Sequence, residues 1–128
     1  MIRPSLVEWA QALLGHEVDA AGEAITAFCR KPKSTKRLHR TRKRLARLRA
    51  VLDDFATLAG VSETFSQRIA RLHRRAGKVR DSDVLLARVK KYMDDASPAE
   101  CVELQHLQKL LRNRAKKQRR KLRRALLQ

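Results

Sequence analysis

The sequence predicts an all-α fold, an antiparallel bundle of four to five helices that forms a single domain over residues 1–128. Three observations predict this fold. Only four glycines and three prolines interrupt the chain, no stretch alternates between apolar and polar residues with period two, and apolar residues recur three and four positions apart. Hydrophobic residues make up 43% of the chain, mainly as Leu and Ala, which supports a real but modest core.

The first predicted helix runs from about Pro4 to Arg30. Glu17 falls inside its apolar stripe, and we expect this carboxylate to pair with an arginine of the next helix, because a buried charge needs a partner. The helix is the least basic segment and is expected to act as a scaffold. Its main apolar stripe consists of Leu6, Trp9, Leu13, Ala20, Ala24 and Phe28, and Val7, Leu14, Val18 and Ile25 widen it.

A second helix is predicted to follow the turn at residues 31–35, with Ser34 or Thr35 as its N-cap, and to end at Ala59 before Gly60. One narrow side of this helix is apolar, and almost all the rest of its circumference is cationic. The inward side consists of Leu38, Thr41, Leu45, Leu48 and Leu52.

Ser62 or Thr64 is expected to cap a third helix that Gly77 breaks or kinks. A short helix then restarts at Asp81 or Ser82 and runs to about Met93. The segment Ser97–Glu100 combines an N-cap, a proline at the first helical position and a capping-box glutamate, so it opens a last helix. The residues expected inward on these helices are Phe65, Ile69, Leu72, Ala76, Val84, Leu85, Val89, Leu104, Leu107, Leu111, Ala115, Leu122 and Leu126.

The charge of the chain indicates a polyanionic partner. Lys and Arg number 31 against 13 acidic residues, a formal net charge of +18. The cations cluster in three runs, Arg30–Arg49, Arg68–Arg80 and Arg112–Arg124, and the last run is expected to be flanking charge. Repulsion along a cationic helix costs stability, and a bound anion would relieve that cost.

The signatures of an enzyme are absent from the sequence. There is no glycine-rich phosphate loop, and the four histidines lack metal-ligand spacing. Cys29 and Cys101 lie far apart and are expected to be buried or bystander thiols. We therefore expect no catalytic residues, no metal and no cofactor. No apolar run approaches the length of a membrane span or a signal peptide, so a cytoplasmic protein with no membrane contact is expected.

Two motifs go beyond composition. The first is His39-Arg40-Thr41-Arg42, followed by Arg47-Leu48-Arg49, and the second is Ala76-Gly77-Lys78-Val79-Arg80-Asp81-Ser82-Asp83-Val84. In this order and at this separation they resemble the CHAD family, the conserved-histidine α-helical domain. The family pattern has a His-x-x-Arg and a basic Arg-Leu-Arg on one helix, then a Leu-Gly-x-x-Arg-Asp-x-Asp-Val segment. This chain departs from it at Ala46, where the family carries a cation, and at Ala76, where it carries leucine.

The resemblance implies an all-helical, non-catalytic domain that binds inorganic polyphosphate through basic residues. It also implies association with polyphosphate granules or with triphosphate-processing proteins. Full members hold two similar bundles across a basic groove, and this chain resembles one half. We therefore expect either that one bundle suffices or that a homodimer rebuilds the groove, with two His39 helices across a common channel and the surplus apolar surface of the first helix buried.

The predicted polyphosphate site combines the second and third helices. His39 falls between Arg42 and Lys43 on the helical wheel, so cations should lower its pKa, and a polyanion would favour its protonated form. The alternative is a neutral histidine that holds a neighbouring helix by a hydrogen bond. The predicted binding residues are Lys36, His39, Arg40, Arg42, Lys43, Arg47, Arg49, Arg68, Arg71, Arg75, Lys78 and Arg80.

Two details of this site depend on how the helices pack. Arg68, Arg71, Arg75 and Lys78 share one flank of the third helix and would form the second wall of a groove if that flank faces the second helix; otherwise they form a solvated flank. Asp81 is expected to cap a helix, and Asp81 or Asp83 to hold an arginine of the second helix in place.

A nucleic-acid-binding protein, nucleoid- or RNA-associated, is the alternative function. Charge supports both ligands equally, and weak nonspecific binding of nucleic acid is expected of so basic a chain. Aromatic residues make up only 4% of the sequence, which leaves little for base stacking. A third hypothesis, compatible with the first, is an accessory protein that docks a phosphatase, a kinase or a storage granule.

Overall fold

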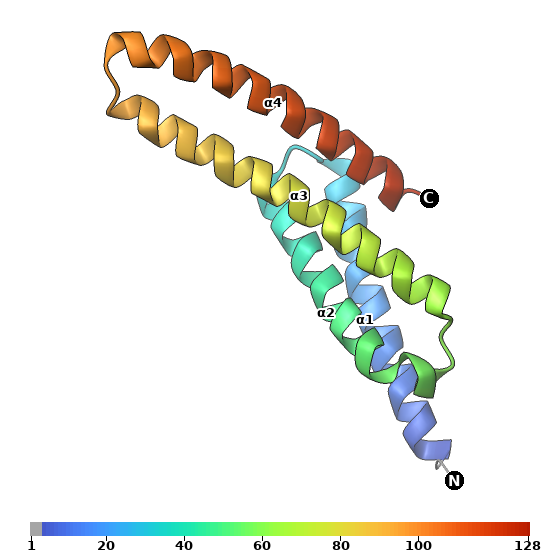
Figure 1. The fold of residues 1–128 in the computed structure, drawn as a ribbon. Coiled ribbons are helices and arrows are strands. Elements are labelled where there is room, and N and C mark those ends of the chain that lie inside the picture. The colour runs from blue at the N-terminus through green and yellow to red at the C-terminus, as the bar shows by residue number, and fades with distance from the viewer. Residues whose placement is uncertain (1–3) are drawn as a thin grey trace.

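The computed structural model describes residues 4–128, which form four α-helices and no strand: α1 (Pro4–Arg30), α2 (Thr35–Ala59), α3 (Glu63–Asp94) and α4 (Pro98–Leu126). Helices α1 and α2 form one antiparallel hairpin, and α3 and α4 form a second (Figure 1). Helix α3 packs on α2, whereas α1 and α4 touch over a small area. The predicted all-α helical bundle is confirmed, with four helices.

The helix starts follow the capping signals. The Ser34, Ser62 and Ser97 side chains each accept a hydrogen bond from the backbone N–H three residues later, at the starts of α2, α3 and α4. Gly60 ends α2 in the left-handed region at φ 76°, a conformation that favours glycine. The connections between helices are three or four residues long, which forces chain neighbours to pack as hairpins.

The core centres on α2. All five residues predicted inward on this helix are buried, and Leu38, Leu45 and Thr41 are fully so. The Thr41 hydroxyl donates to the Ala24 carbonyl of α1 at 3.1 Å, so the one polar member of the stripe joins the two helices. Phe28 of α1 and Leu122 of α4 close the core from the other side.

The predicted break at Gly77 is wrong. Helix α3 runs without interruption through Gly77 to Asp94, so the expected separate helix at residues 81–93 is the second half of α3. A glycine in a helix interior costs only about 1 kcal/mol, and buried Ala76 and Val79 on either side offset that cost by packing. For the same reason Asp81 is a mid-helix residue and caps nothing.

The buried stripe of α1 differs from the predicted one. Leu6, Trp9 and Val18 are exposed. The buried side is rotated around the helix from the predicted stripe and includes three alanines. It consists of Ala10, Leu14, Glu17, Ala21, Ala24 and Phe28.

Helices α3 and α4 extend beyond α1 and α2, and their common end is supported by neither (Figure 1). Leu85 and Leu107, which were predicted inward, are therefore 45% and 43% exposed. None of the helices described for residues 4–128 is apolar enough over sufficient length to cross a bilayer.

Arginines of α2 and α4 bind the carbonyls at the C-terminal end of α1. Arg37 donates to the Ala27 carbonyl at 2.6 Å, and Arg123 donates to the Cys29 carbonyl at 2.9 Å. Arg119 donates to the Pro32 carbonyl in the following turn at 2.8 Å. The last carbonyls of a helix are short of partners within it, and cations there also meet the negative end of the helix dipole. Part of the last basic run is thus structural, which corrects its interpretation as flanking charge alone.

Candidate functional site

The outer side of α2 and the adjoining edge of α1 form a cationic cleft. Because the buried stripe of α2 is narrow, the positions outside it can carry charge. Ala24 and Ala27 of α1 line one part of the cleft, whose volume is about 760 Å³. The other lining residues all come from α2: Lys36, Arg37, His39, Arg40, Lys43, Arg44 and Arg47.

His39 lies half-buried at the border of this cleft with α3. Its Nδ1 atom is buried and has no hydrogen-bond partner. Burial lowers the pKa of the His39 imidazole below its ordinary value, and the charges of Lys43, Arg42 and Arg80 lower it further. The free protein therefore holds a neutral imidazole, with an unused ring nitrogen, beside three cations.

A second histidine lies along the same junction of α2 and α3. Arg49 of α2 contacts Nδ1 of His73 at 3.3 Å, so that nitrogen accepts and the ring is neutral. Burial lowers the pKa of His73, followed by the charges of Arg49, Arg42 and Arg74. The Nε of Arg42 is itself buried without a partner. The charges that lower the two pKa values all come from Lys and Arg, so this junction is strongly cationic.

Few of the cations have a carboxylate partner. Residues 4–128 contain two ion pairs, and one of them lies at the cleft, where Arg47 Nε and Glu17 Oε1 are 3.1 Å apart. The predicted pairing of Glu17 with an arginine of the next helix is confirmed. Glu17 is 2% exposed, whereas the Arg47 side chain is 67% exposed, so its terminal nitrogens remain open to a ligand.

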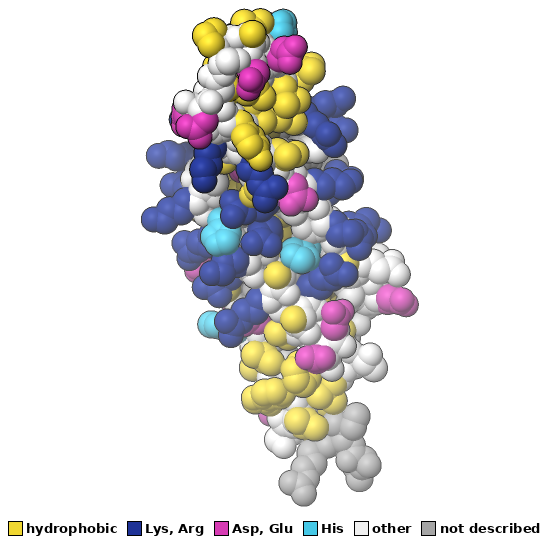
Figure 2. Space-filling model, turned by 60° about the vertical axis from the view of Figure 1, so that its left-hand side comes forward, with side chains coloured by type: hydrophobic (Ala, Val, Ile, Leu, Met, Phe, Trp, Pro, Cys, Tyr) yellow, Lys and Arg dark blue, Asp and Glu magenta, His cyan; other side chains and the backbone are white. Residues whose placement is uncertain are grey.

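The space-filling view shows how the charge is distributed. Lys and Arg side chains surround histidines across the middle of the molecule, and hydrophobic and acidic side chains gather toward both ends (Figure 2). Within the described residues, no group of three or more His, Cys, Asp or Glu side chains is placed to hold a metal ion.

Comparison with known proteins identifies the family. The chain matches the CHAD domain over residues 10–128, a range that includes both motifs and all four helices. The chain belongs to the CHAD family. No curated protein and no solved structure matches it.

The CHAD fold separates the residues that were predicted to form one groove. Arg80 lies close enough to His39 to lower the pKa of the imidazole, so Arg80 is on the flank of α3 that faces α2. Arg75 and Lys78 instead line a separate cleft with Gln118 and Lys121 of α4. Arg68 and Arg71 share that flank by helical spacing. Of the two alternatives for this flank, the one in which it faces the basic side of α2 and forms the second wall of a groove is therefore not the one observed.

The α3 residues that do lie beside α2 include His73 and Arg74, which were not among the predicted binding residues. A signal for His73 was present, because it lies seven residues before Arg80 and so on the same side of an α-helix. Arg37 and Arg44 were likewise left out, although both line the cleft.

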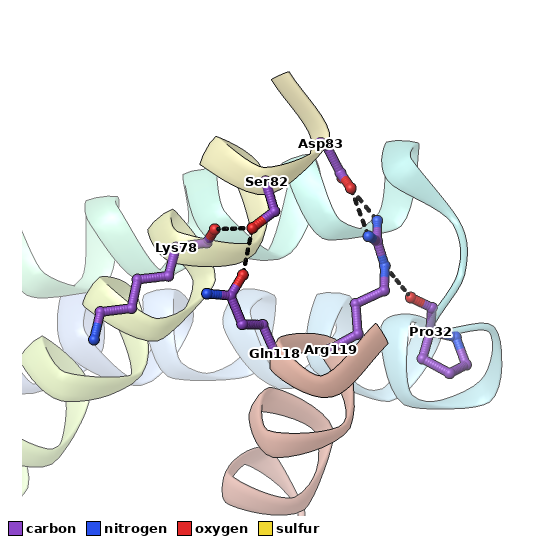
Figure 3. Close-up of polar contacts among 6 residues, drawn as sticks. All are labelled: Pro32, Lys78, Ser82, Asp83, Gln118 and Arg119. Carbon is purple, nitrogen blue, oxygen red and sulfur yellow. Dashed lines mark hydrogen bonds and ion pairs between the residues drawn. The ribbon is translucent and has the colours of Figure 1, made fainter. Parts of the chain in front are cut away.

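Of the two aspartates in the second CHAD motif, Asp83 contacts α4 rather than α2. Both Asp83 oxygens accept from Arg119, at 2.6 and 2.7 Å, and each side chain of this pair is 13% exposed (Figure 3). Gln118, the residue before Arg119 on α4, accepts a hydrogen bond from the Ser82 hydroxyl, which also contacts the Lys78 carbonyl. The expected bond from Asp81 or Asp83 to an arginine of α2 is thus corrected, and Asp81 is exposed.

Proposed function

We propose that this CHAD domain binds inorganic polyphosphate on the cationic surface of α2 and its border with α3, and that it does so without catalysis. The observation that carries the proposal is the gathering of cations around His39 without acidic partners other than Glu17. Both histidines there are held in the neutral form by burial and by positive charge. A bound polyanion would reduce the repulsion between the cations of this surface.

The residues of α2 suit a linear phosphate polymer. Arginine offers forked donors that match phosphate oxygens, and lysine offers a point charge. Lys36, Lys43 and Arg47 follow one side of α2 over eleven residues, about 17 Å of helix. Membership of the CHAD family supports the same ligand class, and recruitment to polyphosphate granules would follow from it.

The first experiment removes charge from the site without touching a structural contact. In the site variant, Lys36, Arg40 and Lys43 become alanine; all three line the cleft, and none makes a hydrogen bond or ion pair in the structure. In the control variant, Lys109, Arg112 and Lys116 of α4 become alanine, which removes the same types of side chain in a similar helical spacing. Affinity for long-chain polyphosphate is measured by calorimetry at about 150 mM salt.

We expect the site variant to lose at least tenfold in affinity and the control variant less than threefold. Both variants have the same net charge, so equal losses would mean that net charge alone binds the polymer and would overturn the proposed site. A competition assay separates the ligands. Polyphosphate should displace duplex DNA and RNA at this salt concentration, and the reverse order would favour the nucleic-acid-binding function.

A further inference from the structure

One face of the α3–α4 hairpin carries exposed hydrophobic residues that no part of the described chain covers. Leu85 and Tyr92 of α3 are seven residues apart and 45% and 68% exposed. Leu107 and Leu110 of α4 are three residues apart and 43% and 68% exposed. Tyr92 and Leu107 line the same shallow cleft, so the two pairs lie on one side of the hairpin, which we call the hairpin face.

The two ends of the hairpin face carry opposite charges. Toward the tip, the cleft that holds Tyr92 and Leu107 is also lined by Asp95, Glu100 and Glu103. Toward the stem, the cleft on the same side of α3 is lined by cations from both helices. These cations are Arg75, Lys78 and Lys121.

The charges of the two clefts lie at similar distances from Leu85 and Leu110, and Asp81, Arg88 and Arg114 lie one helical turn from these leucines. Asp95 lies ten residues after Leu85 and Arg75 ten residues before it, about 15 Å in each direction along α3. On α4, Glu100 lies ten residues before Leu110, and Lys121 lies eleven residues after it. The acidic cleft and the basic cleft thus lie at similar distances on either side of the exposed leucines. When a second copy is turned end to end, the acidic cleft of each copy faces the basic cleft of the other.

We propose that the hairpin face binds a second copy of this chain, with the two hairpins antiparallel about a two-fold axis near Leu85 and Leu110. The acidic tip of each copy then lies on the basic stem of the other, and the exposed leucines and Tyr92 meet in the middle. A parallel arrangement would oppose like charges. This dimer uses a different surface from the cleft at His39, so it does not depend on the proposed function.

The size of the face is that of a weak interface. The face is about 30 Å long from Arg75 to Asp95 and about 20 Å wide for two helices side by side, or about 600 Å² in each copy. The total of about 1,200 Å² is at the lower end of specific interfaces, where weak and transient complexes are found. Because only a few exposed apolar side chains lie at its centre, we expect a dissociation constant in the micromolar range. At about 150 mM salt, repulsion between two chains of +18 is largely screened beyond 8 Å, whereas contacts at the interface are less affected.

The first test measures mass by sedimentation equilibrium from about 5 to 200 μM protein. The chain should approach twice its 14.7 kDa mass as concentration rises. The double variant Leu85→Ser and Leu110→Ser should raise the dissociation constant at least tenfold. The matched control is Val102→Ser, because Val102 is 57% exposed on α4 but points away from the hairpin face by helical spacing. Circular dichroism checks that each variant is folded.

Charge reversal tests the antiparallel register. Glu100→Lys with Glu103→Lys should weaken the dimer, and so should Lys78→Glu with Lys121→Glu. The four changes together should restore it, because the acidic cleft of each copy again faces the basic cleft of the other. A chain that stays monomeric at 200 μM, a dimer that survives the double serine variant, or a four-fold charge variant that stays dissociated would each overturn the proposal.

Discussion

At the scale of single residues, the most informative atom is Nδ1 of His39, which is buried and unpartnered. A histidine that held a neighbouring helix would use a ring nitrogen in a side-chain hydrogen bond, and His39 makes none with the residues that the structure describes. The half-buried ring, close to the charges of Lys43, Arg42 and Arg80, is instead suited to change protonation state when an anion arrives.

This arrangement predicts a pH-dependent affinity for polyphosphate. The pKa of His39 is lowered in the free protein, and phosphate oxygens beside the ring would raise it, so binding takes up a proton between these two pKa values. Affinity should therefore increase as the pH falls from 7.5 to 5.5. His39→Ala should cost about three- to tenfold in affinity at pH 5.5–6 and little at pH 8.

Calorimetry in buffers of different ionisation enthalpy measures the proton uptake directly. His106→Ala is the control, since His106 is exposed on α4, at the far end of the hairpin from the cleft. A loss of affinity that is equal at pH 6 and pH 8 would show that His39 acts as a neutral, structural side chain.

Asp83 and Asp81 give a second prediction at this scale. Asp83→Asn removes the negative charge from a nearly buried ion pair. It therefore weakens the bonds by which Arg119 joins α4 to α3 and to the Pro32 carbonyl. We expect a loss of about 2–4 kcal/mol in the free energy of unfolding. Asp81→Asn, on the exposed side of the same turn, should change it by less than about 0.5 kcal/mol. Urea denaturation measures both, and equal effects would contradict the structural role of Asp83.

At the scale of elements, the uninterrupted path of α3 makes Gly77 a position where alanine should stabilise the protein. A Cβ added at Gly77 meets no atom within 4 Å, and the backbone there is helical. Gly77→Ala should therefore raise the free energy of unfolding by about 0.5–1 kcal/mol. Gly60→Ala is the contrasting variant, because Gly60 has a φ of 76°, and it should lower stability. Stabilisation at Gly60 or destabilisation at Gly77 would contradict this account.

Helix starts and the α2 stripe were predictable because their causes are local. Each N-cap serine bonds an N–H three residues away, and the leucines of α2 repeat at helical spacing whatever they pack against. The break at Gly77 was predicted wrongly because a glycine penalty of about 1 kcal/mol is smaller than the packing of neighbouring Ala76 and Val79.

The site was predictable only in part, because the sequence does not determine how one helix is rotated against the next. The basic face of α2 follows from its own pattern. Helix α3 has cations on two flanks, and packing decides that Arg80 lies near α2 while Arg75 and Lys78 lie near α4. The partner of Asp83 was missed for a similar reason, since Arg119 is 36 residues away on a helix with many arginines.

At the scale of the whole molecule, charge and apolar surface are separated in space. Positive charge occupies the middle, whereas the free end of the α3–α4 hairpin is acidic and apolar (Figure 2). One part of the surface therefore suits a polyanion and another suits a protein, which is consistent with a domain that binds a polymer while it contacts a second copy.

The order of packing along the chain also has a kinetic consequence. Extensive contacts join only consecutive helices through short turns, so little loop-closure entropy is lost at each step, and such topologies fold in microseconds to milliseconds. The bonds from Arg119 and Arg123 to the end of α1, which span 87 and 94 residues, are the exception. We therefore expect docking of the end of α4 to be the last event in folding and the first to reverse, with the basic side of α2 still packed on α1 and α3.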